Sequence, residues 1–479
     1  MRLVVSVLAA INLTVCAALA DPLPERQVDA VIAGIDANYD TNASVAKQLW
    51  DWAELGYQET KSSELLQNTL AARGFEIEAG VADIPTAFTA TWGDSGPVIA
   101  ILAELDALPG INQSEASSRD PIEGKHAGHA CGHNLFAAGS LGAAIAIADW
   151  LEETGTPGIV RLYGTPAEEG GSGKVYMVRA GLFDDVDIAL HWHGSDANSA
   201  AASTSLANRS AKFRFKGISA HAAGAPERGR SALDGVEAMN IMANMMHEHI
   251  PQDARMHYVI TAGGSAPNVV PDFAEVFYYV RHPAATGVQE IWARLENAAR
   301  GAALGTGTEV SWEIIHGNNP LLVNQTLARL MDTNLRKVGG LTYTAEEQAF
   351  AEEIASTIPN PGHALGSERT IQPYGTSLGY GSTDVGDVSR AVPTVGLRTA
   401  TWVPGTSAHS WQAVAASGMS IGFKGAQIAS KTLALTAIEL FRDEALRAKA
   451  TAEFEAARGP NYKYQSLLGD RDPPLDYRK

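Results

Sequence analysis

The sequence is poor in cysteine and in positive charge, and both shortages restrict what the protein can be. Only two cysteines, Cys16 and Cys131, occur in 479 residues, so disulfides cannot be the basis of the fold. Lysine and arginine number 36 against 54 aspartate and glutamate residues, and the net charge of −18 argues against a nucleic-acid partner. Hydrophobic residues make up 45% of the chain, which indicates a globular protein. The chain length allows about two to four domains.

Long hydrophobic runs are also scarce, apart from one at the N-terminus. Arg2 is followed by the uncharged stretch 3–20, and Ala18-Leu19-Ala20 has the small residues of a signal-peptidase site. We therefore expect a signal peptide at residues 1–20, cleaved after Ala20, and a secreted or periplasmic protein. An uncleaved membrane anchor is the alternative, although the run is short and interrupted. After cleavage we expect no membrane association, and Cys131 is the one remaining cysteine.

The first half of the chain alternates between strand and helix patterns. Apolar runs at 98–103, 159–163 and 187–190 predict buried strands, and 135–151 predicts a long apolar helix. This alternation favours an α/β fold with a mostly parallel sheet covered by helices. A polar cluster follows each strand, at the sheet edge where such folds bind ligands.

Between residues 205 and 318 the pattern changes to β-α-β-β-α-β, the order of an α+β ferredoxin-like sandwich. Its helix at 231–249 is rich in methionine, and we expect Met239, Met242, Met245 and Met246 to pack in the core. We therefore predict one α/β domain, formed by residues 21–204 and 319–458 and interrupted by an inserted domain at 205–318. Residues 459–479 form a tail that we expect to wrap the surface.

The motif Gly128-His-Ala-Cys-Gly-His-Asn134 is the strongest local signal for chemistry. It places Cys131 between His129 and His133, immediately before a predicted helix. A lone cysteine is commonly a small buried apolar residue. A thiolate two residues from an imidazole, however, is a ligand pair that suits zinc. We favour the metal-binding interpretation.

Three further clusters follow predicted strands or lie in a small-residue loop: Glu168-Glu169, His191-Trp-His193 and His409. Paired carboxylates are usually solvated, but these follow a buried strand and precede Gly170-Gly171. One carboxylate could bind a metal while the other accepts a proton from water. The strand before His191 is expected to end there, so only one of the two histidines need be a ligand. This set of residues is typical of a dinuclear hydrolase.

The chain resembles the amidohydrolase branch of the co-catalytic metal aminoacylase/carboxypeptidase superfamily, which includes auxin-conjugate and p-aminobenzoyl-glutamate hydrolases. The similarity runs from about residue 45 to 440 and includes the inserted domain. Its motifs are AELDALPG (103–110), GHACGHN (128–134), TPAEEGG (165–171), SAHAAGAPERGRSALD (219–234), NVVPD (268–272) and TSAHSW (406–411).

The resemblance implies roles for particular residues. Two divalent ions, zinc or manganese, would be held by Cys131, His133, Glu169, His193 and His409. Glu168 would be the general base, and Asp106 would orient a ligand without binding metal itself. His193 matches the family ligand better than His191. The chain departs from the family at Glu104, where aspartate is usual, and at Asn134, where aspartate is common.

The inserted domain of such enzymes serves as a lid and a dimer interface, which implies a homodimer. His221 resembles a histidine that the partner subunit places over the active site. Asn268 and Arg281 resemble residues that bind the substrate's carboxylate, although a surface salt bridge is an alternative for Arg281. The implied reaction is hydrolysis of the amide of an N-acyl or N-aroyl amino acid. A dipeptidase or carboxypeptidase, and a non-catalytic periplasmic binding protein, are the alternatives.

Overall fold

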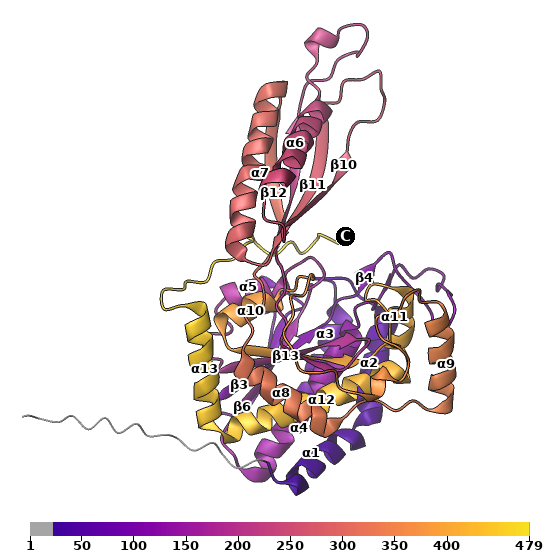
Figure 1. Cartoon of the computed structure of the whole chain (residues 1–479), viewed down its shortest axis with the longest axis vertical. Coiled ribbons are helices and arrows are strands. Elements are labelled where there is room, and N and C mark those ends of the chain that lie inside the picture. The colour runs from indigo at the N-terminus through magenta and orange to yellow at the C-terminus, as the bar shows by residue number, and fades with distance from the viewer. Residues whose placement is uncertain (1–22, 479) are drawn as a thin grey trace, which may run out of the picture.

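The computed structural model describes residues 23–478 of the chain. The predicted signal peptide, its cleavage site and Cys16 lie outside the described residues. Figure 1 shows two lobes: a large α/β domain and the inserted domain, which projects from one end of it. The large domain provides the residues around which the candidate site is built.

A seven-stranded sheet forms the centre of the α/β domain, in the order β1-β2-β6-β3-β7-β13-β8. The four strands β6, β3, β7 and β13 are parallel, while β1, β2 and β8 are antiparallel at the edges. The prediction of a mostly parallel sheet is confirmed, and the antiparallel edges are an addition to it. The strands span Glu76–Ala79 (β1), Phe88–Trp92 (β2), Val98–Glu104 (β3), Ile159–Thr165 (β6), Ile188–Ser195 (β7), Ser199–Ala201 (β8) and Thr394–Ala400 (β13).

Helices cover this sheet, and two of them form the centre of the packing. Helix α4 (His133–Thr154) lies against α12 (Ser420–Arg442). Gly139 permits a close approach, because a Cβ there would lie 2.7 Å from the Trp192 ring. Length and composition alone would let α4 cross a membrane, but most of it is buried in the core. The other helices are α1 (Glu25–Ala37), α2 (Tyr39–Trp52), α3 (Thr60–Ala71), α5 (Gly173–Arg179), α8 (Gln325–Val338), α9 (Ala345–Ser356), α10 (Val385–Ala391), α11 (Trp411–Ser417) and α13 (Glu444–Arg458).

The inserted domain has its own sheet and its own hydrophobic core. Its strands are antiparallel in the order β10-β11-β9-β12, and helices α6 and α7 pack together on the sheet. This is the predicted ferredoxin-like arrangement. The elements are β9 (Ala207–Lys216), α6 (Ala232–Met246), β10 (Arg255–Ala262), β11 (Phe273–His282), α7 (Ala285–Thr306) and β12 (Glu309–Asn318).

The methionines of α6 do not all pack in the core. Met239 and Met246 are buried as expected, but the side chains of Met242 and Met245 are 37% and 65% exposed. The expectation was wrong for these two because they lie on the solvent side of the helix, next to the exposed Ile241. The helix therefore presents an apolar outer face.

The C-terminal tail lies along the surface, in keeping with the expectation, and passes between the two lobes, where two of its residues are buried. Leu468 packs into the core of the α/β domain and Leu467 into that of the inserted domain. Farther along, the Arg471 guanidinium donates a hydrogen bond to the carbonyl oxygen of Ile314 on β12. Figure 1 shows the C-terminal segment ending between the lobes. The tail therefore contacts both domains where they meet.

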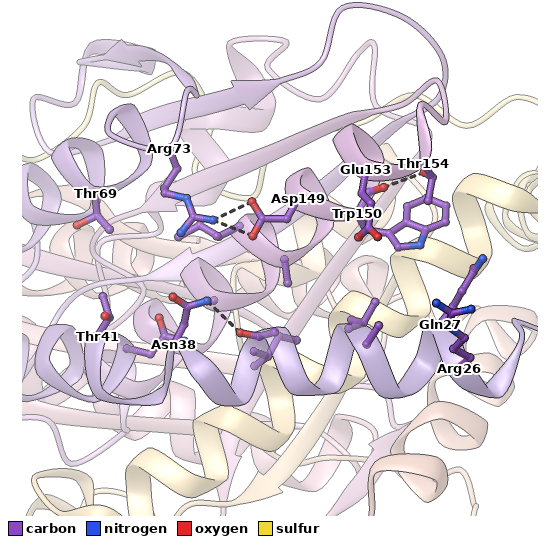
Figure 2. A pocket seen from close by; sticks show the side chains of 18 of the residues that line it. Arg26, Gln27, Asn38, Thr41, Thr69, Arg73, Asp149, Trp150, Glu153 and Thr154 are labelled. Carbon is purple, nitrogen blue, oxygen red and sulfur yellow. Dashed lines mark hydrogen bonds and ion pairs between the residues drawn. The ribbon is translucent and has the colours of Figure 1, made fainter.

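A large cavity of about 800 Å³ lies between α1, α3 and α4 (Figure 2). Arg73 pairs with Asp149 at 2.7 Å among its lining residues. The cavity is lined by the C-terminal half of α4, whereas His133 begins that helix. Because no candidate metal ligand lines it, this cavity is separate from the site described next.

Candidate metal centre

The polar clusters predicted from the sequence meet at one edge of the parallel sheet. Strand β3 ends at Glu104, β6 ends just before Glu168 and Glu169, and β7 carries His193. Parallel strands present their carboxyl ends at the same edge, which explains why segments far apart in the chain converge. Figure 1 shows α5, which follows the Glu168 turn, directly beneath the inserted domain.

Two groups of potential metal ligands share one sulfur atom. Cys131, His133 and His193 place one ligand atom each within 4.8 Å of one another, and so do Cys131, Glu169 and His409. Cys131 Sγ lies 3.3 Å from His193 Nε2, and His409 Nε2 lies 3.1 Å from Glu169 Oε1. The structure thus brings together all five residues expected to bind metal.

The donor atoms fit two divalent ions. Glu169 Oε1 and His133 Nε2 are both buried, and neither takes part in a hydrogen bond of good geometry within residues 23–478. Desolvation lowers the pKa of His193 to about 3, so its imidazole is neutral, as a ligand must be. Thiolate, imidazole and carboxylate are a ligand set that borderline ions such as zinc accept.

Strand β7 continues through His191 and His193 to Ser195, whereas we had expected it to end before them. The two imidazoles, two residues apart on the strand, share one face of the sheet. Only His193 lies beside Cys131. His191 packs against Gly396 of β13, where a Cβ would lie 2.3 Å from His191 Nε2. The geometry therefore favours His193 as the ligand.

Asp106 is buried and contacts both His133 and the turn that carries the two glutamates. His133 Nδ1 lies 2.9 Å from the Asp106 carbonyl oxygen and 3.1 Å from Oδ1. The Asp106 carboxylate also accepts the backbone N–H groups of Glu168 and Glu169, at 3.1 and 2.9 Å. With Nδ1 so occupied, His133 directs Nε2 toward the other candidate ligands. Asp106 itself belongs to none of the ligand groups.

The turn at 166–172 has a strained backbone, since Ala167 and Ser172 have φ angles of 57° and 59°. The fully buried Glu59 accepts the N–H of Ala167 at 2.8 Å, and the Tyr57 hydroxyl donates to the carbonyl of Gly171 at 2.7 Å. These contacts hold the turn in a conformation that non-glycine residues rarely adopt. Sequence analysis missed Glu59, which is distant in the chain and belongs to no motif.

We expect replacement of Glu59 by glutamine to change how stability depends on pH. Burial, with a contribution from Asp106, raises the pKa of Glu59 to about 8. The folded state therefore holds a proton that the unfolded state loses at lower pH, and wild-type stability falls as pH rises between about 4.5 and 8. The glutamine variant does not lose stability in this way. The difference in free energy of unfolding between the variant and the wild type should therefore grow in favour of the variant by about 1.4 kcal/mol for each pH unit in that interval.

Denaturant unfolding of both proteins at pH 5, 6 and 7 measures this difference. Glutamine can still accept from the N–H of Ala167 and can bond the hydroxyl of Thr86, the second partner of Glu59. The exposed Glu64→Gln is a suitable control and should show no such trend. Parallel pH profiles for Glu59→Gln and the wild type would contradict the expectation.

The C-terminal tail also contacts this turn. Arg478 Nη2 donates to the carbonyl oxygen of Glu169 at 2.6 Å, and the Tyr477 hydroxyl donates to it at 3.2 Å. The Tyr477 ring also packs edge-on against Tyr57, with centroids 5.6 Å apart. The tail and Tyr57 therefore contact each other, and both bind backbone carbonyls of the turn.

We expect Arg478→Ala combined with Tyr477→Phe to lower kcat by about 10- to 100-fold, because small displacements of reacting groups have effects of this size. The overall fold should survive, since Leu467 and Leu468 still anchor the tail. Steady-state kinetics and metal content of the double variant are the measurements. Replacement of the exposed Lys463 in the same tail should change neither, and wild-type kinetics in the double variant would show that the tail does not position the turn.

A buried charge cluster lies beside the candidate ligands. Lys174 is fully buried and pairs with Glu104 and Asp384, each at 2.7 Å. Glu104 Oε2 in turn lies 3.0 Å from His133 Nε2. Breaking such a buried pair leaves an uncompensated charge, so Lys174 fixes the position of Glu104. A signal was present in the sequence, because Lys174 directly precedes the apolar run 175–178.

The two departures from the family pattern have different consequences. Glu104 lies within the site, where it forms a third potential ligand group with His133 and Glu168. The Asn134 side chain instead donates to the carbonyl oxygens of Ala46 and Ser417, at 3.0 and 2.9 Å. Only the departure at Glu104 therefore lies at the candidate ligands, where it keeps the negative charge of aspartate but adds one methylene to the side chain.

The three inserted-domain residues are not part of the ligand groups. His221 and Asn268 are exposed and adjacent, since the N–H of Ala222 donates to the Asn268 carbonyl at 3.0 Å. Arg281 lies at the base of the inserted domain, where its Nη1 is 3.4 Å from the Ser382 hydroxyl. Within residues 23–478 no ion pair involves Arg281, so the salt-bridge alternative finds no acidic partner there.

Comparison with known proteins agrees with this geometry. The model of the peptidase family M20/M25/M40 matches residues 100–368. The chain is 40% identical over 451 residues to a subunit of p-aminobenzoyl-glutamate hydrolase from Escherichia coli, covering 88% of this chain and 93% of that protein. It is 29% identical to Xaa-Arg dipeptidase of Mus musculus, over 88% of this chain and 90% of that protein.

Among solved structures, a dinuclear metal-binding peptidase of the M20 family from Bacillus subtilis shares the fold. Its TM-score is 0.57 at 18% identity, over 85% of this chain and 99% of that one. The family model spans more than half of the chain, and the 40% identity extends over nearly all of the Escherichia coli relative. The chain therefore belongs to the peptidase family M20/M25/M40.

Proposed function

We propose that the protein is a metal-dependent amidohydrolase that cleaves the amide bond of N-acyl or N-aroyl amino acids. The observation that carries this proposal is the pair of ligand groups sharing Cys131, with Glu168 beside them. The similarity to the p-aminobenzoyl-glutamate hydrolase of Escherichia coli supports the choice of an amino acid conjugate as substrate.

The residues divide the chemistry between binding and proton transfer. Cys131, His133, Glu169, His193 and His409 would hold two divalent ions, zinc or manganese, which when bound polarise the amide carbonyl and acidify a shared water. Asp106 orients His133 through Nδ1 and fixes the turn through two backbone N–H groups.

Glu168 serves as the proton carrier. Desolvation, together with the nearby carboxylates Glu104 and Glu169, raises the pKa of Glu168 well above its usual range. A carboxylate of raised pKa takes a proton from the attacking water more readily. Glu168 then delivers this proton to the nitrogen of the leaving amine, which completes the reaction.

The inserted domain would act as a lid and as the interface of a homodimer. Asn268 and Arg281 would bind the carboxylate of the amino acid, and His221 of the partner subunit would hydrogen-bond the oxyanion. Two features support a dimer. Strand β10 is an edge strand with exposed apolar residues, and α6 exposes others next to it: Tyr258, Val259, Ile260, Ile241, Met242 and Met245.

We further propose a secreted or periplasmic location, on the basis of residues 1–20. In an oxidising compartment, metal ligation would protect Cys131, the one cysteine left after cleavage, from oxidation. N-terminal sequencing of the exported protein tests this, with a mature chain beginning at Asp21 as the expected result.

Metal analysis combined with a substrate screen tests the activity. We expect about two ions per chain and hydrolysis of N-acyl or N-aroyl amino acids that stops on chelation and returns with added zinc or manganese. Dipeptides belong in the same screen, because the similarity to Xaa-Arg dipeptidase favours a peptidase as the second candidate. Faster cleavage of dipeptides would support that candidate, and activity that resists chelation would contradict both.

A further inference from the structure

A second, smaller cavity of about 300 Å³ lies directly beside the candidate metal ligands. Its charged and imidazole lining residues are Glu104, Glu168, His191, His193 and Arg398. Apolar side chains and a group of small hydroxyl residues, Ser203, Ser377, Ser382 and Thr383, complete the lining. The combination of one guanidinium with several hydroxyls is typical of a pocket for an anionic group.

The strand register explains why Arg398 faces this cavity. Strand β13 runs parallel to β7, with Gly396 opposite His191 and Arg398 opposite His193. Residues two apart on a strand point to the same side. Gly396 leaves room for the His191 ring, so Arg398 shares the sheet face of both histidines. It is the one exposed residue of a strand that is paired on both sides, and this exposure is explained by the cavity that it lines.

The Arg398 guanidinium has no hydrogen-bonding or ionic partner within the described part of the chain. Cys131, Asp196 and Glu104 act on it electrostatically. Cys131 is one of the proposed metal ligands, Asp196 accepts from His363 at 3.0 Å and Glu104 pairs with Lys174. Partial removal from water without a partner is unfavourable for a charged group. A ligand carboxylate would provide the missing partner, in the bidentate geometry that arginine prefers.

We propose that Arg398, with the hydroxyls of Ser203, Ser377 and Thr383, binds a second carboxylate of the substrate. The preferred substrates then carry two carboxylates, one on the amino acid backbone and one beyond it. The second can lie on the side chain of the amino acid or on the acyl group. This inference rests on the proposed amidohydrolase function and specifies its substrate class.

Three substrates separate the possibilities: N-acetyl-leucine with one carboxylate, N-acetyl-glutamate with a second on the side chain, and N-succinyl-leucine with a second on the acyl group. We expect kcat/KM of the wild type to be about 10- to 100-fold higher for one of the two dicarboxylates than for N-acetyl-leucine, the size expected of hydrogen bonds to a charged group. Arg398→Gln should abolish this preference, measured within the variant as the ratio of kcat/KM for the dicarboxylate to that for N-acetyl-leucine.

Arg398→Lys keeps the charge without the bidentate geometry and should retain part of the preference. Arg329→Gln, an exposed arginine on α8, is the matched control and should keep all of it. Equal rates on all three substrates, or an equal loss on all three in Arg398→Gln, would overturn the inference while the proposed function stands.

Binding of succinate and glutarate by calorimetry, with wild-type and Arg398→Gln holoenzyme, gives a readout independent of turnover. We expect the wild type to bind at least one of them about 10-fold more tightly than the variant does. If no amide is hydrolysed but this difference is found, the proposed function fails and the anion subsite stands. If neither dicarboxylate distinguishes the two proteins, the subsite is wrong.

Discussion

Replacement of Glu168 by glutamine is expected to lower kcat by about 100- to 10,000-fold, the contribution usual for a general acid–base group. Glutamine keeps the size of the side chain but can neither accept the proton of the attacking water nor deliver one to the leaving amine. The backbone contacts of the turn involve the N–H of residue 168 and would persist. The effect should therefore appear in kcat with little change in KM.

Metal content decides how such a result is interpreted. Since the metal ligands proposed above do not include Glu168, the variant should retain both ions after dialysis. Glu153→Gln, at the exposed C-terminal end of α4, is a matched control and should behave as the wild type. A Glu168→Gln enzyme with near-normal turnover would refute the assignment of the base, and one that has lost metal would indicate that Glu168 is a ligand.

Replacement of Cys131 by serine is expected to weaken the binding of both metal ions. Cys131 is the one residue common to the two groups Cys131-His133-His193 and Cys131-Glu169-His409. Serine has nearly the same shape, but its hydroxyl is a poor ligand for a borderline ion that favours sulfur. We expect the affinity for zinc to fall by at least about 100-fold, since changes in residues that merely support ligands already cost 10- to 100-fold.

Elemental analysis after dialysis against a weak chelator measures this loss. His409→Ala is an informative comparison, because it removes a ligand from one group alone and should lower the content by about one ion per chain. The stoichiometries of the two variants should therefore differ. Unchanged metal content in Cys131→Ser would exclude the sulfur as a ligand.

Much of the site could be predicted from the sequence because its signals are local. Cys131 and His133 lie two residues apart at a helix entrance, and Glu168 and Glu169 follow a buried strand. The fold class could be predicted for the same reason, since buried strands alternate with helical patterns along the chain. The ferredoxin-like order of the inserted domain could also be predicted, because the spacing of apolar residues differs between strands and helices.

The residues that sequence analysis missed act across long separations. Glu59 contacts a turn that begins more than a hundred residues later, and Lys174 pairs with Asp384. Such contacts depend on how strands are ordered in the sheet, which no local pattern encodes. Arg398 was missed for a related reason, because strand register places it opposite His193. The exposed Met242 and Met245 were misjudged because helical period alone does not tell how wide the buried face is.

The contact between the tail and the Glu168-Glu169 turn can form only after both domains have been synthesised. Tyr477 and Arg478 follow every helix and strand, yet they hold the carbonyl of Glu169. A nascent chain that already has both cores would still lack this contact, and a protease that trimmed a few residues would release the turn without touching the fold.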